Sequence, residues 1–127
     1  MSEKIKELRR NTEDAMRFFE KNLAYTLGPV ELKEMLAENK VKLLDVRAKE
    51  DYDISHLPSA ENIPYDELDE KMENLSKEDI HVVYCYNYLC HLGDRVAYKM
   101  AKSGYPVMLL QGGFKSWVED FHFAVVS

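Results

Sequence analysis

The sequence has no long apolar run and no cluster of basic residues. A membrane span needs about eighteen consecutive apolar residues, and no stretch of the 127 residues comes close to that length. The segment from Met1 to Arg10 mixes charges of both signs and lacks the apolar core of a signal peptide. Lysine and arginine total 17 against 23 acidic residues, which gives a net charge of −6. We therefore expect a soluble, cytoplasmic protein that binds neither membranes nor nucleic acid.

Cysteine is also scarce. The two cysteines, Cys85 and Cys90, exclude a disulfide scaffold, and in a reducing cytosol we expect both to be free thiols. With His91 they place three possible metal ligands within seven residues, but no second ligand pair accompanies them elsewhere in the chain. We therefore expect no bound zinc.

The first part of the chain predicts a helix. Apolar residues recur three and four positions apart between residues 3 and 24, and the charges between them nearly balance. We expect this amphipathic helix to pack its Phe18 and Phe19 face on its own domain, the alternative being a dimer contact. The chain then divides into a helical extension, residues 1–24, and one domain, residues 25–127, while the oligomeric state stays open.

Apolar strand-like runs alternate with helical segments in the rest of the chain. Strands that are apolar on both faces and separated by helices indicate a parallel sheet covered on both sides, so the predicted class is α/β. The apolar end, Phe121 to Val126, is expected to pack back as an edge segment or to lie in a subunit contact. The predicted strands are 41–46, 61–63, 81–84 and 107–110, and the predicted helices are 29–38, 66–74, 93–103 and a last one after Gly113.

The feature that most directly suggests chemistry is a buried strand that ends on Cys85. A polar and aromatic loop, residues 86–91, follows it, and a helix begins between Leu92 and Asp94. Parallel α/β sheets bind ligands at the carboxyl ends of strands, and a helix N-terminus offers free N–H groups to an anion. We expect the loop amides to lower the pKa of the Cys85 thiol below its free value of about 8.5. The alternative is a buried, inert cysteine.

Five segments between residues 27 and 117 carry recognisable motifs. They are Leu43 to Tyr52 with its Asp-Val-Arg, His56 to Pro64, Val82 to Cys85, Ser103 to Tyr105, and Leu110 to Trp117 with its Gly-Gly pair. In this order they resemble the rhodanese-like domain family, which includes single-domain sulfurtransferases. The resemblance implies a three-layer fold, with a parallel central sheet flanked by helices on both faces. It also implies that Cys85 is catalytic and carries a persulfide, and that Asp45 and Arg47 are structural residues near the site.

The loop departs from the family's common pattern in ways that bear on the substrate. Common loops read Cys-Arg-x-Gly-x-Arg, whereas Tyr86 follows the cysteine here and the spacing from Cys85 to Gly104 is about two residues longer. Because an arginine to hold thiosulfate is missing, we expect polysulfide to be a better sulfur donor. Phosphatases that share this fold have arginine six positions after the cysteine, where this chain has His91, which argues against phosphatase activity.

The loop is the predicted substrate-binding segment, and its members are Tyr86, Asn87, Tyr88, Leu89, Cys90 and His91. The aromatic and apolar side chains suggest a substrate mouth or a protein-docking surface, or else a self-packed loop. Cys90 is either a resolving thiol that closes a disulfide with Cys85 or a side chain packed under the helix N-terminus. We expect His56 to hydrogen-bond loop backbone, and His81 and His122 to be structural.

Three functions are compatible with this sequence. The first is a sulfurtransferase, in which Cys85 takes sulfur from a polysulfide, persulfide or thiosulfate and passes it to cyanide or to a thiol, including a protein thiol. This function requires no metal or organic cofactor. The second is a catalytically silent rhodanese-like module that binds or regulates a partner. The third is a reductase that uses Cys85 and Cys90 as a dithiol.

Overall fold

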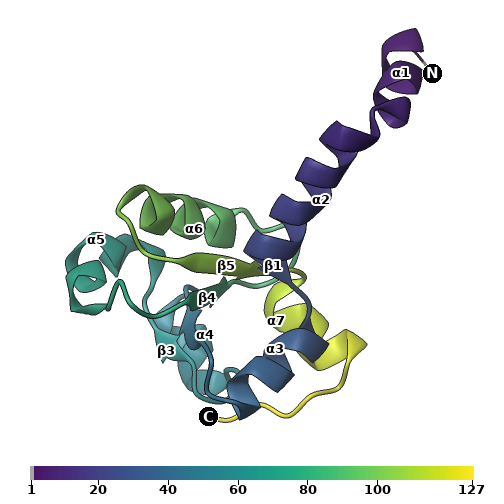
Figure 1. The fold of residues 1–127 in the computed structure, drawn as a ribbon. Helices are drawn as coiled ribbons and strands as arrows, with labels where there is room; N and C mark the ends of the chain where they lie inside the picture. The colour runs from purple at the N-terminus through teal and green to yellow at the C-terminus, as the bar shows by residue number, and fades with distance from the viewer. Residues whose placement is uncertain (1) are drawn as a thin grey trace.

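The computed structural model describes residues 2–127, which form a five-stranded sheet with helices around it (Figure 1). The strands are β1 (Thr26–Leu27), β2 (Lys42–Asp45), β3 (Glu61–Asn62), β4 (His81–Tyr84) and β5 (Val107–Leu110). The α-helices are α1 (Glu3–Arg10), α2 (Thr12–Tyr25), α3 (Pro29–Ala37), α4 (Lys49–Ile54), α5 (Leu68–Lys71), α6 (Leu92–Lys102) and α7 (Gly113–Lys115). Short turns of other helix types cover Tyr65–Glu67, Met72–Asn74 and Ser116–Asp120. Within residues 2–127, no helix has the length and apolarity that a membrane crossing requires.

The sheet is parallel throughout, with the strand order β1-β5-β4-β2-β3. The strands β2 and β4 are neighbours in the sheet, and their pairing places Asp45 opposite Tyr84. The carboxyl ends of these two strands therefore lie side by side, at the end of the sheet where parallel sheets bind ligands. The predicted α/β class is confirmed.

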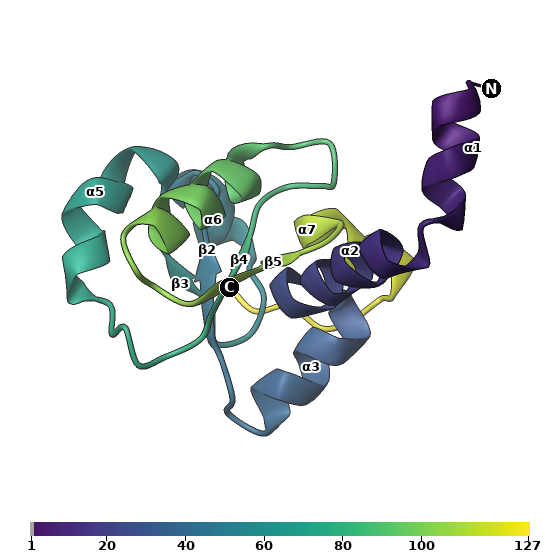
Figure 2. The ribbon, with the colours of Figure 1, turned by 45° about the horizontal axis from the view of Figure 1, so that its top comes forward.

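Apolar side chains cover both faces of the sheet. Successive residues of a strand point to opposite faces, so β4 contributes to both halves of the core. On the side of α3 and α7, the buried residues include Leu27, Leu32, Leu43, Val82, Tyr84, Leu110 and Trp117. On the side of α5 and α6, they include Leu44, Leu68, Val83, Cys85, Val96 and Met100. Figure 2 shows α6 on one side of the sheet and α3 on the other, which is the predicted three-layer arrangement.

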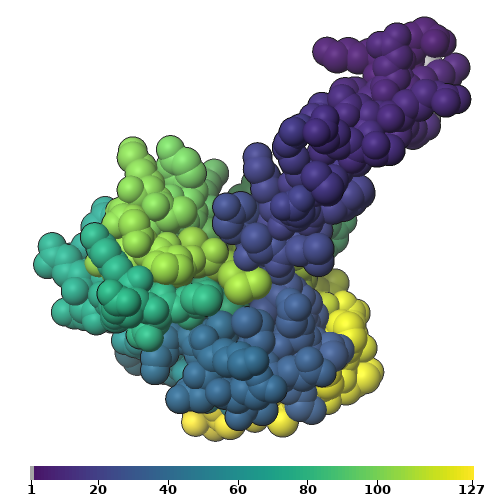
Figure 3. Space-filling view, in the orientation of Figure 1, coloured from purple at the N-terminus to yellow at the C-terminus, as the bar shows by residue number. Residues whose placement is uncertain are grey.

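The N-terminal arm, defined as α1 and α2, projects from the rest of the molecule (Figures 1 and 3). Neither helix contains a buried residue. The Phe18 and Phe19 side chains, whose rings meet edge to face, are 64% and 57% exposed. The predicted packing of this face on the domain is therefore wrong.

The path of the chain explains why the arm stays exposed. The arm leads directly into β1, which is an edge strand, so only the end of α2 reaches the sheet. The arm is also broken into two helices at Asn11. The Asn11 side chain accepts a hydrogen bond from the Asp14 backbone N–H and caps α2, while its own N–H ends α1 on the Leu8 carbonyl.

The C-terminal segment takes the first of its two predicted positions and packs back on the domain. Phe123 and Val125 lie against the cluster on the α3 side of the sheet. The Trp117 Nε1–H donates to the Ala124 carbonyl at 2.9 Å. Val126 forms an isolated antiparallel bridge with His56. These contacts hold the end of the chain beside the segment that follows α4.

Candidate active site

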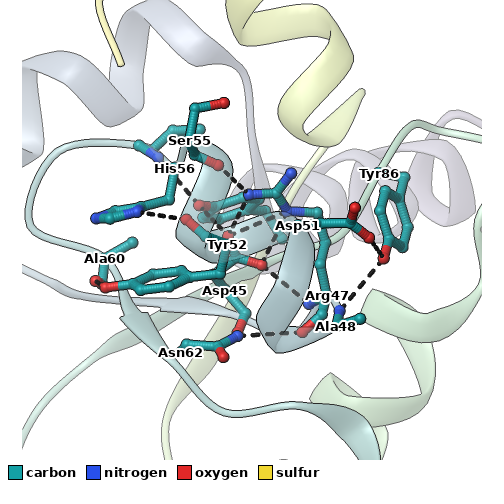
Figure 4. Close-up of polar contacts among 12 residues, drawn as sticks. Asp45, Arg47, Ala48, Asp51, Tyr52, Ser55, His56, Ala60, Asn62 and Tyr86 are labelled. Atoms are coloured by element: carbon teal, nitrogen blue, oxygen red, sulfur yellow. Dashed lines mark hydrogen bonds and ion pairs between the residues drawn. The ribbon is translucent and has the colours of Figure 1, made fainter. Parts of the chain in front are cut away.

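A buried ion pair occupies the end of β2. Asp45 is fully buried and Arg47 is only 3% exposed. The Arg47 Nε donates to both carboxylate oxygens of Asp45, at 3.0 and 3.1 Å, and its Nη2 donates to Asp45 Oδ2 at 2.7 Å (Figure 4). The remaining donor contact goes from Arg47 Nη2 to the Ser55 carbonyl at 2.7 Å. Such forked pairing fixes both side chains, as a structural role requires.

The next strand adds a tyrosine to this ion pair. The Tyr84 hydroxyl donates to Asp45 Oδ2 at 2.6 Å and accepts the Leu57 backbone N–H at 3.1 Å. Burial, together with the negative charge of Asp45, raises the pKa of Tyr84 well above its usual value. Sequence reasoning identified Asp45 and Arg47 but missed Tyr84, because a tyrosine in an apolar strand has no pattern that distinguishes it from core.

Two histidine rings are buried or half-buried, and each lies within hydrogen-bond distance of a backbone carbonyl. The His56 Nδ1 lies 2.9 Å from the Tyr52 carbonyl, and the ring stacks on the Tyr52 ring. The His81 Nδ1 lies 3.0 Å from the Pro106 carbonyl. Both rings therefore bind backbone, but the partner of His56 lies in helix α4 and not in a loop as predicted. His122, within the C-terminal segment, adopts a positive φ of 55°.

Cys85 follows β4 directly and is only 4% exposed. Its backbone carbonyl accepts the Phe114 N–H at 2.9 Å, which ties the strand end to the Gly112-Gly113 turn. A side chain at Gly113 would place its Cβ 2.6 Å from that carbonyl, and the residue has a φ of 59°, so glycine is required there. On the other side, a Cβ at Gly93 would lie 2.8 Å from the Leu109 side chain. The backbone therefore approaches Cys85 closely at Gly113, whereas a Cβ at Gly93 would lie 3.6 Å from the Cys85 sulfur, an ordinary contact distance.

The predicted lowering of the Cys85 pKa is wrong. Burial raises the pKa of this thiol to about 11, and the neighbouring Cys90 side chain adds to the increase. The backbone N–H groups of Gly93 and Tyr86 act in the opposite direction but do not prevail. The Cys85 Sγ donates to the Cys90 carbonyl at 3.4 Å, so a carbonyl oxygen stabilises the protonated sulfur.

The internal bonding of the loop explains why so few amides reach the sulfur. The Leu89 N–H donates to the Asn87 side chain at 2.9 Å, and the Cys90 N–H donates to the Asn87 carbonyl at 3.1 Å. Asn87 therefore takes two of the amides that the sequence suggested would surround the thiolate.

A pocket of about 370 Å³ opens over Cys85. Of the predicted substrate-binding residues, Asn87, Tyr88 and Cys90 line it. The lining also includes residues from α6, β5 and the turn after β5, which sequence reasoning missed: Asp94, Leu109, Leu110, Gln111 and Gly112. The order of strands in the sheet, which places β5 beside β4, cannot be read from local sequence patterns.

The structure places the other three predicted loop residues elsewhere. The Tyr86 hydroxyl donates to the Asp51 carboxylate and accepts the Ala48 N–H at 3.2 Å, so the side chain reaches the start of α4 (Figure 4). Leu89 is 75% exposed, and His91 lines a separate pocket on the outer side of α6. Only part of the predicted segment surrounds the thiol.

The electrostatics of the pocket disfavour highly charged anions. Asp94 is the one charged residue in its lining, and no lysine or arginine from residues 2–127 contributes to it. The same described range contains no group of three or more histidine, cysteine, aspartate or glutamate side chains placed to hold a metal ion. The pocket therefore offers two thiols, amide and aromatic groups, and one negative charge.

The fold and the site together define a parallel α/β domain with a cysteine at the end of its central strand. Comparison with known proteins identifies the family to which this domain belongs. The model of the rhodanese-like domain family matches residues 28–120. This chain belongs to the rhodanese-like domain family.

Several known proteins are similar to the chain. Thiosulfate sulfurtransferase GlpE of Coxiella burnetii is 29% identical over 72% of this chain and 84% of its own length. The HTH-type transcriptional regulator Rv0324 of Mycobacterium tuberculosis is 32% identical over 61% of this chain, which spans only 34% of that relative. The crystal structure of the BH2092 protein from Bacillus halodurans matches 92% of this chain and 87% of its own, at 29% identity and a TM-score of 0.84.

Proposed function

We propose that this protein is a sulfurtransferase that carries a persulfide on Cys85. The observation that supports this most strongly is the position of the thiol, at the end of the central strand and in the lining of a pocket. The proposal agrees with the name of a relative, thiosulfate sulfurtransferase GlpE, because this chain matches 84% of that protein's length. A reducing compartment such as the cytoplasm would keep both thiols available.

The first step of the reaction is removal of the Cys85 proton. In the resting state, the sulfur donates to the Cys90 carbonyl. Once the proton has left, that hydrogen bond is lost, while the N–H groups of Tyr86 and Gly93 remain directed at the sulfur. The thiolate then attacks the outer sulfur of the donor, and the donor's remaining group leaves with the electron pair of the broken bond.

The second step removes the sulfur from Cys85. A thiolate or cyanide attacks the outer sulfur of the persulfide, and the Cys85 thiolate is the leaving group. Because the remaining group of the sulfur donor leaves before the acceptor reacts, the kinetics are ping-pong.

The charge of the pocket favours some donors over others. Thiosulfate carries two negative charges and would approach Asp94 without any cationic partner in the lining. A persulfide of a small or protein thiol carries fewer charges for the same transferable sulfur. We therefore place thiosulfate behind thiol persulfides as a donor.

Intact mass spectrometry of two variants tests the proposal. Reduced Cys90→Ser protein is incubated with polysulfide, with Cys85→Ser in parallel. Cys90→Ser should gain the mass of one sulfur atom, which dithiothreitol removes, and Cys85→Ser should gain none. Uptake that survives Cys85→Ser would move the carrier to another residue, and absence of uptake in every variant would contradict sulfur transfer altogether.

One observation favours a second candidate, a binding module whose cysteine does not turn over. The raised pKa leaves little Cys85 thiolate at neutral pH. Under this candidate, the exposed apolar face of the N-terminal arm is the contact surface. The same loading experiment separates the candidates, because a silent module does not take up sulfur even at a pH that ionises the thiol.

A further inference from the structure

The two thiols of the chain belong to one site. Cys85 and Cys90 both line the pocket described above, and the Cys90 side chain packs against the apolar cluster that contains Cys85. The Cys90 carbonyl lies 3.4 Å from the Cys85 sulfur. The hydrogen bond from the Cys90 N–H to the Asn87 carbonyl turns the chain back toward the strand end, which brings the second cysteine there.

The contact extends to the side chains. The Cys90 side chain packs against the apolar cluster that contains Cys85, lines the same pocket, and helps to raise the pKa of the Cys85 thiol. Among the described lining residues, Cys90 is the other nucleophilic sulfur, and no lysine or histidine competes with it. The segment between the thiols lies outside helix and strand, in the loop that projects between β4 and α6 (Figure 2), so Cys90 can move without disrupting either element.

We propose that Cys90 resolves the Cys85 persulfide by closing a Cys85–Cys90 disulfide and releasing the sulfur as hydrosulfide. The protein would then act as a reductase of persulfide sulfur, in addition to passing sulfur to external acceptors. This inference rests on the proposed function, because it begins from the persulfide on Cys85.

The chemistry balances without any other oxidant. The Cys90 thiolate attacks Sγ of Cys85, a bond forms between the two cysteine sulfurs, and the bond from Sγ to the outer sulfur breaks. The outer sulfur leaves with the electron pair as hydrosulfide. The two cysteines are oxidised to a disulfide and the transferred sulfur is reduced. A low-potential dithiol then restores both thiols by disulfide exchange, which completes a catalytic cycle.

Attack on the inner sulfur follows from the geometry and from the leaving group. Cys90 lies beside Sγ itself, whereas the outer sulfur extends into the open pocket. Hydrosulfide is a weaker base than a cysteine thiolate, so it leaves more readily. Since both reacting groups are held in one loop, the step does not need a second molecule to bind.

The experiment follows the persulfide after the donor has been removed. Reduced wild-type protein, Cys90→Ser and Leu89→Ser are loaded briefly with polysulfide labelled with heavy sulfur, desalted without reductant and sampled for intact mass. Leu89→Ser is the matched control, because it changes an exposed neighbour in the same loop and keeps both thiols. Released hydrosulfide is trapped and its label measured.

We expect the wild type and Leu89→Ser to lose the added sulfur and to become two hydrogens lighter than the reduced protein, with release of labelled hydrosulfide. In Cys90→Ser the persulfide should persist at least about tenfold longer. A wild-type persulfide as long-lived as that of Cys90→Ser would overturn the resolving role while leaving sulfur transfer intact. If no variant takes up sulfur, the proposed function fails, and the resolving role with it.

Discussion

The ends of β2 and β4 lie side by side in the sheet, yet they are built for different tasks. At the end of β2, every donor and acceptor of the Asp45 and Arg47 side chains that is buried has a partner. At the end of β4, the Cys85 sulfur faces a pocket, and its strongest contact is a loop carbonyl. The first strand end is therefore a fully paired support, whereas the second presents a thiol to a pocket and is the reactive position under the proposed function.

The link between the two ends is Tyr84, which precedes Cys85 in the chain. The Tyr84 side chain lies on the α3 side of the sheet and donates to Asp45 of the buried ion pair, while Cys85 points to the opposite face of the sheet. The strand that carries the thiol is thereby anchored one residue before it. A rigid strand end allows the thiol position to be fixed even though the loop beyond it is irregular.

The largest effect is expected from breaking the support. Asp45→Asn leaves the buried Arg47 charge without a counter-ion, so we expect the free energy of unfolding to fall by about 3–5 kcal/mol. Urea unfolding followed by circular dichroism measures the change. Asp53→Asn, which removes an exposed ion pair with Lys49, is the control and should cost less than about 1 kcal/mol. Equal effects of the two substitutions would show that the buried pair is not a support.

The reactivity of the second strand end should depend strongly on pH. With a pKa of about 11, Cys85 should react with iodoacetamide roughly a hundredfold more slowly at neutral pH than a free cysteine of pKa about 8.5. Cys90→Ser isolates this thiol, and burial still raises its pKa there. The rate, measured by mass spectrometry, should climb through pH 9–10 without levelling. A plateau below pH 8 would contradict the protonated resting state.

The raised pKa of Cys85 also predicts how the stability of the fold changes with pH. The folded-state pKa of Cys85 lies above the unfolded value, so its contribution to stability is complete below the unfolded pKa. That contribution is lost as the pH rises from about 8.5 toward the folded value of about 11.

The two strand ends were not equally predictable from sequence. Strands that are apolar on both faces indicated the parallel sheet, and the position of Cys85 after such a strand indicated the site. Helix α4 was missed because one and a half turns carry little periodicity, and strand β1 because its two residues directly follow helix α2. The direction of the loop carbonyls was missed as well, since it depends on how Asn87 satisfies its neighbours' amides.

A smaller loss of stability should follow removal of the link. Tyr84→Phe keeps the ring but leaves the Leu57 N–H without its acceptor and Asp45 without one donor. We expect a loss of about 1–3 kcal/mol in the free energy of unfolding. Tyr98→Phe, at an exposed ring on α6, is the matched control and should change little. If both variants unfold at the same urea concentration, the hydroxyl does not anchor the strand.

The charge beside the thiol should have a modest effect on donor choice. Asp94→Asn removes the negative charge of the pocket lining, and we expect sulfur loading from thiosulfate to become about two- to fivefold faster at low salt. Loading from a thiol persulfide should change less. Glu38→Gln removes one charge far from the site, next to Lys40, and controls for net charge. An unchanged rate with thiosulfate would mean that Asp94 does not repel the donor.

The smallest effect on either strand end is expected from removing the N-terminal arm. Deletion of residues 1–24 removes helices without a buried residue and leaves β1 in place, so the free energy of unfolding should change by less than about 1 kcal/mol. Deletion through residue 27 is the contrasting variant, because it removes the buried Leu27 and the carbonyl that accepts the Gln111 N–H. Size-exclusion chromatography with light scattering compares the oligomeric states. Unfolding of the shorter deletion would show that the arm completes the core after all.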